Sequence, residues 1–221
     1  MTEKPRASLR EEQRKLTRNR LLDAAVGVLS EKSIIDTTME DIARAAGVTR
    51  VTVYAHFPGK AEIVDALAER VYGVLGTAFA DLAALPRWNR TTVRAWLDTA
   101  ANRWSDVAPI LRVVRPLSSA VNRNSTDARD QFVSAQQSYT VALLENQARW
   151  RQVAPAEAAQ RARMAVLQTE AFLSAWLIAG VPMDEDDPLI LLTDSLCHLL
   201  GPACERDESD PDSRKGKDGY S

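Results

Sequence analysis

The sequence predicts an all-helical fold, and three observations support this prediction. Ala, Leu, Arg and Glu, which favour helices, are frequent, whereas glycine occurs only 9 times in 221 residues. No long run of alternating β-branched residues is present, so strands are not expected. Apolar residues instead recur at spacings of three and four within segments that end at glycine or proline, which is the pattern of amphipathic helices.

Composition and charge place the chain among ordinary globular proteins. Hydrophobic residues make up 45% and charged residues 26%, and the net charge is only -2. Residues 1–60 hold eleven Lys and Arg against eight Asp and Glu, and the rest of the chain holds 17 against 22. This asymmetry permits a basic N-terminal region that faces nucleic acid. The charged N-terminus has no apolar signal region and no apolar stretch is long enough to span a bilayer, so we expect a cytoplasmic protein with no membrane partner.

Few residues suggest catalysis or metal binding. The two cysteines, Cys197 and Cys204, are not part of a Cys/His metal pattern, and Cys197 is expected to be a small core residue. The acidic residues 184–187 are interpreted as the first turn of a helix, where they complement its dipole. Because no nucleophile–base pair and no phosphate loop are found, we expect no enzyme, no metal and no cofactor.

Breaking residues and changes in composition divide the chain into four parts. The N-terminal part is polar and basic, and the last part is charged and nearly free of apolar residues. The predicted parts are a disordered basic arm (1–15), a three-helix domain (16–62), a larger helical domain (63–204) and a disordered tail (205–221). In and beside the arm, the basic residues that could contact phosphates or a minor groove are Arg6, Arg10, Arg14, Lys15, Arg18 and Arg20.

Helix boundaries follow from caps, glycines and prolines. The glycine and proline positions that matter most are Gly47, Pro86, Pro109, Pro155 and Pro182. The predicted helices are 17–30, Thr38–Ala46, Thr49–Phe57, Lys60–Leu85, Arg90–Val107, a short segment Ile110–Val121, Thr126–Val153, Pro155–Ala179 and Asp187–Leu200.

The two short helices form a helix-turn-helix pattern, in which the first helix braces the second. Thr38 and Thr49 are suited to cap their N-termini, and Gly47 can adopt the left-handed conformation of the turn. Apolar residues would pack the helices together, and polar residues of the second helix would face outward toward phosphates and base edges. The inward residues are Ile42, Ala43, Val48, Val53 and Phe57, and the outward ones are Thr49, Arg50, Thr52, Tyr54 and His56.

The stretch Thr38–Lys60 resembles the signature of the tetracycline-repressor (TetR) family. It carries Ile-Ala-x-x-Ala-Gly-Val, then Thr-x-x-Thr, then Tyr-x-His-Phe and a lysine, and the resemblance covers about residues 16–65. Val51 departs from the family pattern, which usually has Gly, Ala or Pro there, and this leaves the DNA sequence that is read open. The resemblance implies that Thr38 and Thr49 cap helices, that Arg50 and Val51 point at base edges, and that Thr52, Tyr54, His56 and Lys60 hold the DNA backbone.

The resemblance also implies the partners. They are a double-stranded, palindromic DNA operator, a second copy of the chain, and a small-molecule effector that releases a repressor from DNA. The predicted architecture is therefore an N-terminal three-helix helix-turn-helix DNA-binding domain plus a larger C-terminal helical domain for ligand binding and dimerisation. The dimer interface would use the last two helices, with the apolar residues Val166, Leu173, Leu177, Leu189, Leu192, Leu196 and Leu199.

Aromatic residues of the larger domain are the candidates for an effector pocket, because pockets in helical bundles are mostly apolar with a few polar groups. The candidates are Trp96, Trp104, Phe132, Gln136, Tyr139, Phe172 and Trp176. Two alternatives stay open: such residues form an ordinary core, and Trp176 faces the dimer partner. Arg103, Arg112 and Arg115 are either anion ligands or surface charges. An alternative function is a helical carrier protein that has lost DNA binding, with Val51 as the indication.

Overall fold

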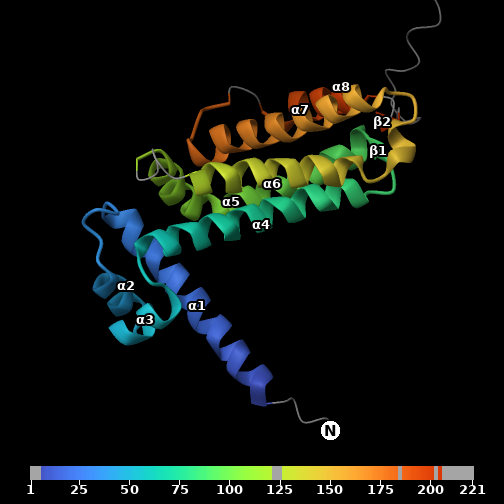
Figure 1. Ribbon diagram of the computed structural model, residues 1–221. Helices are drawn as coiled ribbons and strands as arrows, with labels where there is room; N and C mark the ends of the chain where they lie inside the picture. Colours follow the sequence, from blue (N-terminus) through green and yellow to red (C-terminus); the bar gives the residue numbers. More distant parts are fainter. Residues whose placement is uncertain (1–5, 121–125, 184–185, 202–203, 206–221) are drawn as a thin grey trace, which may run out of the picture. The chain divides into compact units, whose positions relative to one another are not determined.

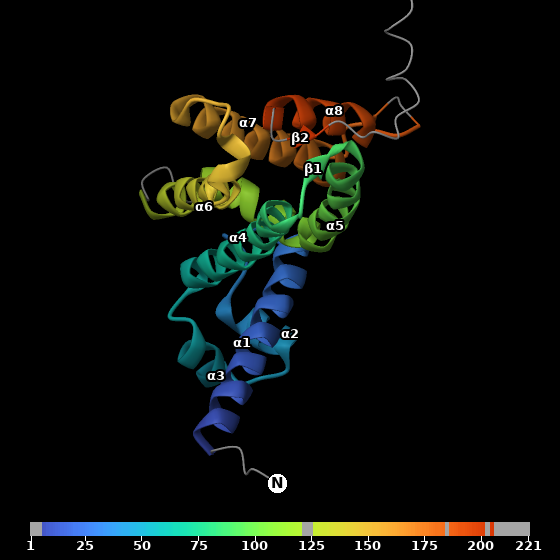
Figure 2. The ribbon, with the colours of Figure 1, turned by 90° about the vertical axis from the view of Figure 1, so that its right-hand side faces the viewer.

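The computed structural model describes residues 6–120, 126–183, 186–201 and 204–205. The chain forms two compact units (Figures 1 and 2). The N-terminal unit comprises Met1–Gly73 and Asp106–Phe132, and the C-terminal unit comprises Val74–Ser105 and Val133–Ser221. The boundary predicted between residues 62 and 63 therefore differs from the division in the structure, which falls at Gly73, within a helix.

The N-terminal unit contains α1 (Arg6–Glu31), α2 (Met39–Ala46), α3 (Arg50–His56) and the start of α4 (Lys60–Ala84). The predicted start of α1 near residue 17 is wrong, because residues 6–15 are helical and not a disordered arm. These residues are polar, but no glycine or proline interrupts the helix between Arg6 and Val26, and Glu, Gln, Lys and Arg are good helix formers. Residues 1–5 of the predicted arm and the predicted tail from 206 onward lie outside the described residues.

The core of the N-terminal unit lies where α1 packs against α2, and α2 packs against α3. Phe57 is fully buried and closes this core at the end of α3, and the guanidinium of Arg18 lies 4.4 Å from the centre of its ring. This packing fixes the orientation of α3, which makes too few backbone hydrogen bonds to be stable alone. The buried apolar residues are Leu21, Leu22, Ala25, Ile42, Ala43, Ala46, Val53 and Phe57.

The remaining elements are helical apart from one pair of two-residue strands. They are α5 (Arg90–Ala120), α6 (Thr126–Leu144), a 3₁₀ turn η1 (Gln147–Trp150), α7 (Pro155–Leu173), a π-helical turn η2 (Ser174–Ile178) and α8 (Leu189–Leu200). The strands β1 (Trp88–Asn89) and β2 (Cys204–Glu205) pair in parallel, with Trp88 opposite Cys204. The all-helical prediction is confirmed, and this short pairing was not foreseen. Within the described part of the chain, no helix is both long and apolar enough to cross a bilayer.

Three further predicted helix boundaries are wrong. The sequence predicts a break before Pro109, but α5 continues through it, because residues such as Val107, Ala108 and Ile110 on either side are buried and their packing outweighs the local cost of proline. The helix predicted to run to Val153 ends at Leu144. There the buried Trp150 folds back, and its indole N–H donates a 3.0 Å hydrogen bond to the carbonyl of Leu143.

The third difference lies at the end of α7. The sequence predicts one helix to Ala179, but the α-helix ends at Leu173 and five residues follow in a π-helical turn. Each of these five residues is only half-buried. A π-turn carries one residue more per turn than an α-helix, so it changes the face on which the following side chains lie.

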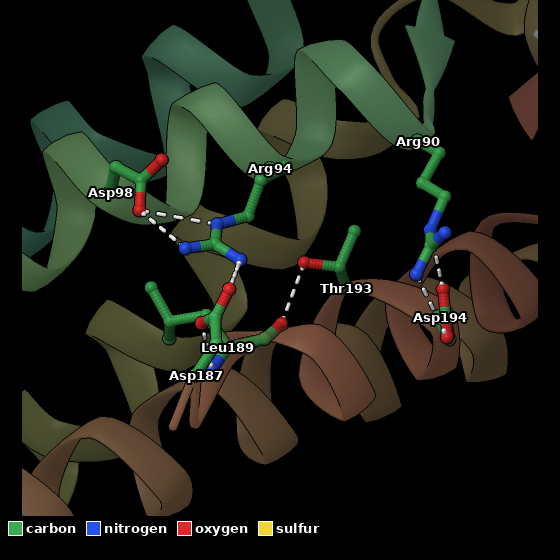
Figure 3. A network of polar contacts seen from close by, with 7 residues as sticks. All are labelled: Arg90, Arg94, Asp98, Asp187, Leu189, Thr193 and Asp194. Atoms are coloured by element: carbon green, nitrogen blue, oxygen red, sulfur yellow. Dashed lines mark hydrogen bonds and ion pairs between the residues drawn. The ribbon is translucent and has the colours of Figure 1, made fainter. Parts of the chain in front are cut away.

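Within the C-terminal unit, ion pairs connect the start of α5 to α8 (Figure 3). The guanidinium of Arg94 pairs with the carboxylate of Asp187, and its Nη2 lies 3.2 Å from Asp98 Oδ1. Arg90 Nε lies 2.8 Å from Asp194 Oδ1. Asp187 also accepts a 3.1 Å hydrogen bond from the N–H of Leu189. The predicted acidic first turn is wrong for Asp187, because α8 begins at Leu189 and its first turn holds no acidic residue. Asp187 lies just before the helix and accepts from its first N–H, while residues 184–185 lie outside the described residues.

Candidate functional site

The first helix of the helix-turn-helix begins at a reciprocal cap. The N–H of Asp41 donates to Thr38 Oγ1 at 3.1 Å, and the N–H of Thr38 donates to Asp41 Oδ2 at 3.0 Å. This is the capping box expected from the sequence. The hydrogen bonds from Thr38, together with the nearby Lys32, lower the pKa of Asp41 to about 2. The charged carboxylate therefore holds the cap closed at neutral pH.

The turn between α2 and α3 depends on Gly47. This residue has φ 62° and ψ 38°, the left-handed conformation, and its N–H donates to the carbonyl of Arg44 at 3.1 Å. Thr49 then caps α3, because its hydroxyl accepts from the N–H of Thr52 at 3.2 Å. The two threonine hydroxyls lie 2.9 Å apart. The predicted caps of both short helices are confirmed.

α3 presents one face outward. Val53 is fully buried, whereas Val51 is 79% exposed and Arg50 and Tyr54 are also exposed. The guanidinium of Arg50 lies 5.4 Å from the centre of the Tyr54 ring, so a cation–π contact preorganises it on this face. Thr52, whose hydroxyl is shared with Thr49, is half-buried. The exposed face is thus rich in hydrogen-bond donors and is short enough for a major groove.

His56 lies half-buried at the C-terminal end of α3, on the side that faces α1. Its pKa is lowered from the usual value, first by burial and then by the positive charges of Arg14 and Arg18. The sequence placed Arg14 on a disordered arm, but it lies on helix α1. The imidazole of His56 therefore lies near two cationic groups, Arg14 and Arg18, beside α3.

Lys60 contacts backbone carbonyls of its own chain in the structure, whereas the sequence predicts a contact with a DNA phosphate. Its ammonium donates to the carbonyls of Ile34, at 2.6 Å, and Thr37, at 2.7 Å, and lies 3.4 Å from that of Ile35. An ammonium has three donors, and these carbonyls occupy them. Lys60 thus ties the start of α4 to the loop before α2, and we replace the expected DNA contact by a positioning role.

These features define a helix-turn-helix protein whose second helix is exposed and polar, and comparison with known proteins identifies the family. Residues 21–67 match the family described as "Bacterial regulatory proteins, tetR family". The uncharacterized HTH-type transcriptional regulator TtgW of Pseudomonas putida is 34% identical over 122 residues, which cover 54% of this chain and 90% of TtgW. The HTH-type transcriptional regulator SrpR of Pseudomonas putida is 34% identical over 120 residues, 53% of this chain and 56% of SrpR.

Solved structures agree in fold. A tetR-family transcriptional regulator from Streptomyces coelicolor matches with a TM-score of 0.61 at 20% identity, over 84% of this chain and 79% of that one. A complex of SmeT with triclosan matches with a TM-score of 0.63 at 23% identity, over 83% of this chain and 91% of that one. The chain belongs to the tetR family of DNA-binding transcriptional regulators, a family of non-enzymatic proteins.

Three of the candidate pocket residues meet inside the C-terminal unit, around a residue that sequence reasoning missed. Phe79 of α4 is fully buried and stacks on Tyr139, with ring centres 5.1 Å apart. Trp96 and Trp104 lie 5.8 and 6.2 Å from the same ring. The Trp96 indole donates to the carbonyl of Ala78 at 2.7 Å, but Trp104 Nε1 is buried without a hydrogen-bond partner among the described residues.

Gln136 contributes a polar contact to this interior. Its amide donates to the carboxylate of Glu170 on α7, a residue that the sequence analysis did not single out. Burial raises the pKa of Glu170 to about 7. The sequence contains a sign that Glu170 faces inward: it lies four residues after Val166 and three before Leu173, and both of these α7 residues are buried.

The other candidates lie apart from this cluster. Phe132 is 46% exposed and belongs to the N-terminal unit, where its ring centre lies 6.5 Å from that of Tyr72. Phe172 and Trp176 are half-buried and form their own pair, with ring centres 6.3 Å apart. Among the candidate anion ligands, Arg103 pairs with Asp81, which favours the surface-charge alternative for this residue.

The residues expected to face a dimer partner need correction. Five of the seven are buried within the chain's own C-terminal unit, because they fill the space between helices of the same chain. Only Leu177 and Leu199 are half-buried. The buried ones are Val166, Leu173, Leu189, Leu192 and Leu196.

Proposed function

We propose that this chain is a ligand-responsive repressor that binds a two-fold symmetric operator as a homodimer and is released by a small molecule. The observation that carries the DNA-reading part is the outward face of α3, where Arg50, Val51 and Tyr54 are exposed while Val53 anchors the helix. Arg50 is the base reader in this proposal, because a guanidinium donates two hydrogen bonds to guanine. Thr38, Thr49, Thr52, Tyr54 and His56 contact the DNA backbone.

A second copy of the chain is the expected partner of α7 and α8. These helices pack against each other, and each leaves large apolar side chains exposed to solvent. Apolar side chains on neighbouring helices suit a two-fold interface, in which the same surface meets itself. A dimer spaces its recognition helices by about 34–36 Å, one turn of DNA. The exposed residues that would form this interface are Met164, Leu167, Ile190 and Leu191.

The C-terminal unit supplies the effector site in this proposal. Its buried aromatic cluster of Phe79, Trp96, Trp104 and Tyr139 resembles the apolar lining of small-molecule pockets. The similar fold of SmeT holds triclosan in a solved complex, which supports a ligand-binding role for such a helical unit. The effector would favour a dimer state in which the two recognition helices no longer fit adjacent major grooves.

Selection from a pool of random-sequence duplexes tests this function. We expect the wild-type protein to enrich one two-fold symmetric sequence whose half-sites lie about one helical turn apart. A gel-filtration measurement on the purified complex should give two chains per duplex. Enrichment of no sequence would contradict DNA reading and favour a helical carrier protein, and a single chain on an asymmetric site would contradict the dimer.

A further inference from the structure

We propose that the effector carries a protonated amine next to a flat aromatic group, and that Glu170 and Gln136 bind the amine inside the C-terminal unit. This inference rests on the proposed function, because it names the chemical class of the molecule that the effector site takes. The site comprises Glu170 of α7, Gln136 of α6 and the aromatic cluster around Phe79.

The contact between Gln136 and Glu170 leaves a buried hydrogen-bond acceptor without a partner among the described residues. The Gln136 amide gives one of its N–H donors to Glu170, and its own oxygen, Oε1, is buried without a hydrogen-bond partner among the described residues. Buried polar atoms without partners cost stability, so they are rare unless a ligand or water meets them. A carboxylate and an amide oxygen together can accept the three N–H donors of an ammonium group.

The surroundings suit an aromatic cation. Gln136 lies one helical turn before Tyr139, whose ring stacks on Phe79 at 5.1 Å. Trp104 meets the same Phe79 ring edge-on, and its indole N–H is unpaired. Aromatic faces attract cations and stack with flat rings, and both effects are stronger away from water.

The charge of Glu170 supports the same ligand class. Burial raises its pKa to about 7, which means that the unit does not stabilise the carboxylate fully by its own groups. A bound cation beside the carboxylate would favour its ionised form. An anionic ligand would disfavour the ionised form.

The end of α7 offers a place where the packing can adjust. The π-helical turn Ser174–Ile178 begins four residues after Glu170, and Trp176 within it is only half-buried. π-turns occur often at functional sites in helices. Phe172, near the end of α7, and Trp176, in the π-helical turn, pair with each other and are both half-buried, so this segment is packed less tightly than the core.

Titration calorimetry with matched probes tests the inference. The probes are 1-naphthylmethylamine and imipramine, which are cations at pH 7, and their neutral counterparts 1-naphthylmethanol and carbamazepine. We expect at least one amine to bind wild type at least tenfold more tightly than its neutral counterpart. E170Q should lose tenfold or more in amine affinity and keep its affinity for the neutral compound.

Two further variants complete the experiment. Q136M, which removes the amide acceptor, should weaken amine binding severalfold, and it keeps the test valid if E170Q does not fold. E145Q is the matched control, because Glu145 is exposed at the end of α6 and should bind both probes as wild type does. The inference is overturned if neither amine binds wild type at millimolar concentration, or if E170Q and Q136M bind the amines as wild type does.

The outcome can be separated from that of the proposed function. Operator binding by wild type and E170Q, each without probe, is measured in parallel on the selected duplex. Intact operator binding with no amine preference would overturn this inference alone. Amine binding that depends on Glu170, in a protein that selects no duplex, would overturn the repressor and leave the amine site standing.

Discussion

The ammonium of Lys60, in the first turn of α4, lies 2.7 Å from the carbonyl oxygen of Thr37, the residue just before the cap of α2. The same ammonium donates to the carbonyl of Ile34 at 2.6 Å. Lys60 therefore connects both ends of the helix-turn-helix, since α4 follows α3 and the loop precedes α2. The position of α3 depends on this connection and on the buried Phe57.

The first prediction concerns Lys60→Met, which keeps the length of the side chain but removes the donors. Hydrogen bonds to charged groups contribute about 1.5–3 kcal/mol each, so we expect the free energy of unfolding to fall by about 2 kcal/mol. Urea denaturation followed by circular dichroism measures this loss. The salt dependence of DNA binding should keep its slope, because Lys60 releases no counterion. If the salt slope of Lys60→Met were smaller than that of wild type by about one unit, the result would support a phosphate contact by Lys60 and contradict the positioning role.

The second prediction concerns the cap of α2. Thr38→Ala removes the hydroxyl that accepts from the N–H of Asp41, and such N-cap losses cost about 0.5–2 kcal/mol. Thr38→Ser keeps the hydroxyl and should retain most of the stability. Thermal unfolding of the three proteins gives the comparison. Equal melting temperatures for the alanine variant and wild type would show that the capping box does not stabilise α2.

The third prediction concerns pH and His56. Its pKa is lowered in the folded protein by burial and by Arg14 and Arg18, so the unfolded chain binds the proton more readily. The stability contributed by neutral His56 is therefore present above its unfolded pKa of about 6.5 and is lost as the pH falls through the lowered folded value. His56→Gln should show a smaller loss of stability between pH 7 and pH 5. A loss equal to that of wild type would contradict this assignment.

DNA should reverse the effect on His56. A phosphate near its imidazole favours the protonated form, so the operator complex of wild type should strengthen as the pH falls from 8 to 6. His56→Gln should show a flatter profile over the same range. Binding profiles are measured at constant ionic strength, because phosphate contacts respond to salt. Parallel pH profiles for the two proteins would contradict a contact between His56 and DNA.

The fourth prediction concerns Asp187, which pairs with Arg94 and accepts from the N–H at the start of α8. Asp187→Asn removes the charge but keeps an acceptor, and we expect only a small loss of stability, because the pair is partly exposed. The hydrogen bond from Arg94 lowers the pKa of Asp187, so its contribution is present above the usual carboxyl pKa and fades at lower pH. Asp186→Asn, at an exposed neighbour, is the control. Equal losses for the two variants would contradict the role of the pair.

Local signals in the sequence were sufficient for the DNA-reading part of the fold. Thr38, Gly47 and Thr49 act through the backbone within a few residues, so their roles follow from spacing alone. Polarity alone does not predict disorder at the start of α1, because residues 6–15 are largely good helix formers and extend the helix. The continuation of α5 through Pro109 depends on packing between distant segments, which no local pattern reveals.

Some site residues can likewise be predicted from local sequence pattern, whereas others depend on contacts made in the folded chain. The exposed face of α3 follows from helical periodicity, but the contacts of Lys60 with carbonyls more than 20 residues earlier required the fold. The interior of the C-terminal unit was only partly foreseen. Tyr139, Trp96 and Trp104 were expected, whereas Phe79 and Glu170 became visible only through their contacts with Tyr139 and Gln136.

The central claim is that Arg50 on α3 reads a base in the operator, and one anisotropy titration tests it most directly. Wild type, Arg50→Ala and the exposed control Arg163→Ala are titrated against the selected duplex and against its single-base variants. We expect Arg50→Ala to lose about 1–3 kcal/mol on the selected duplex and to stop discriminating at one base pair in each half-site, while Arg163→Ala binds as wild type does. Equal loss on every duplex, or no loss at all, would contradict the account.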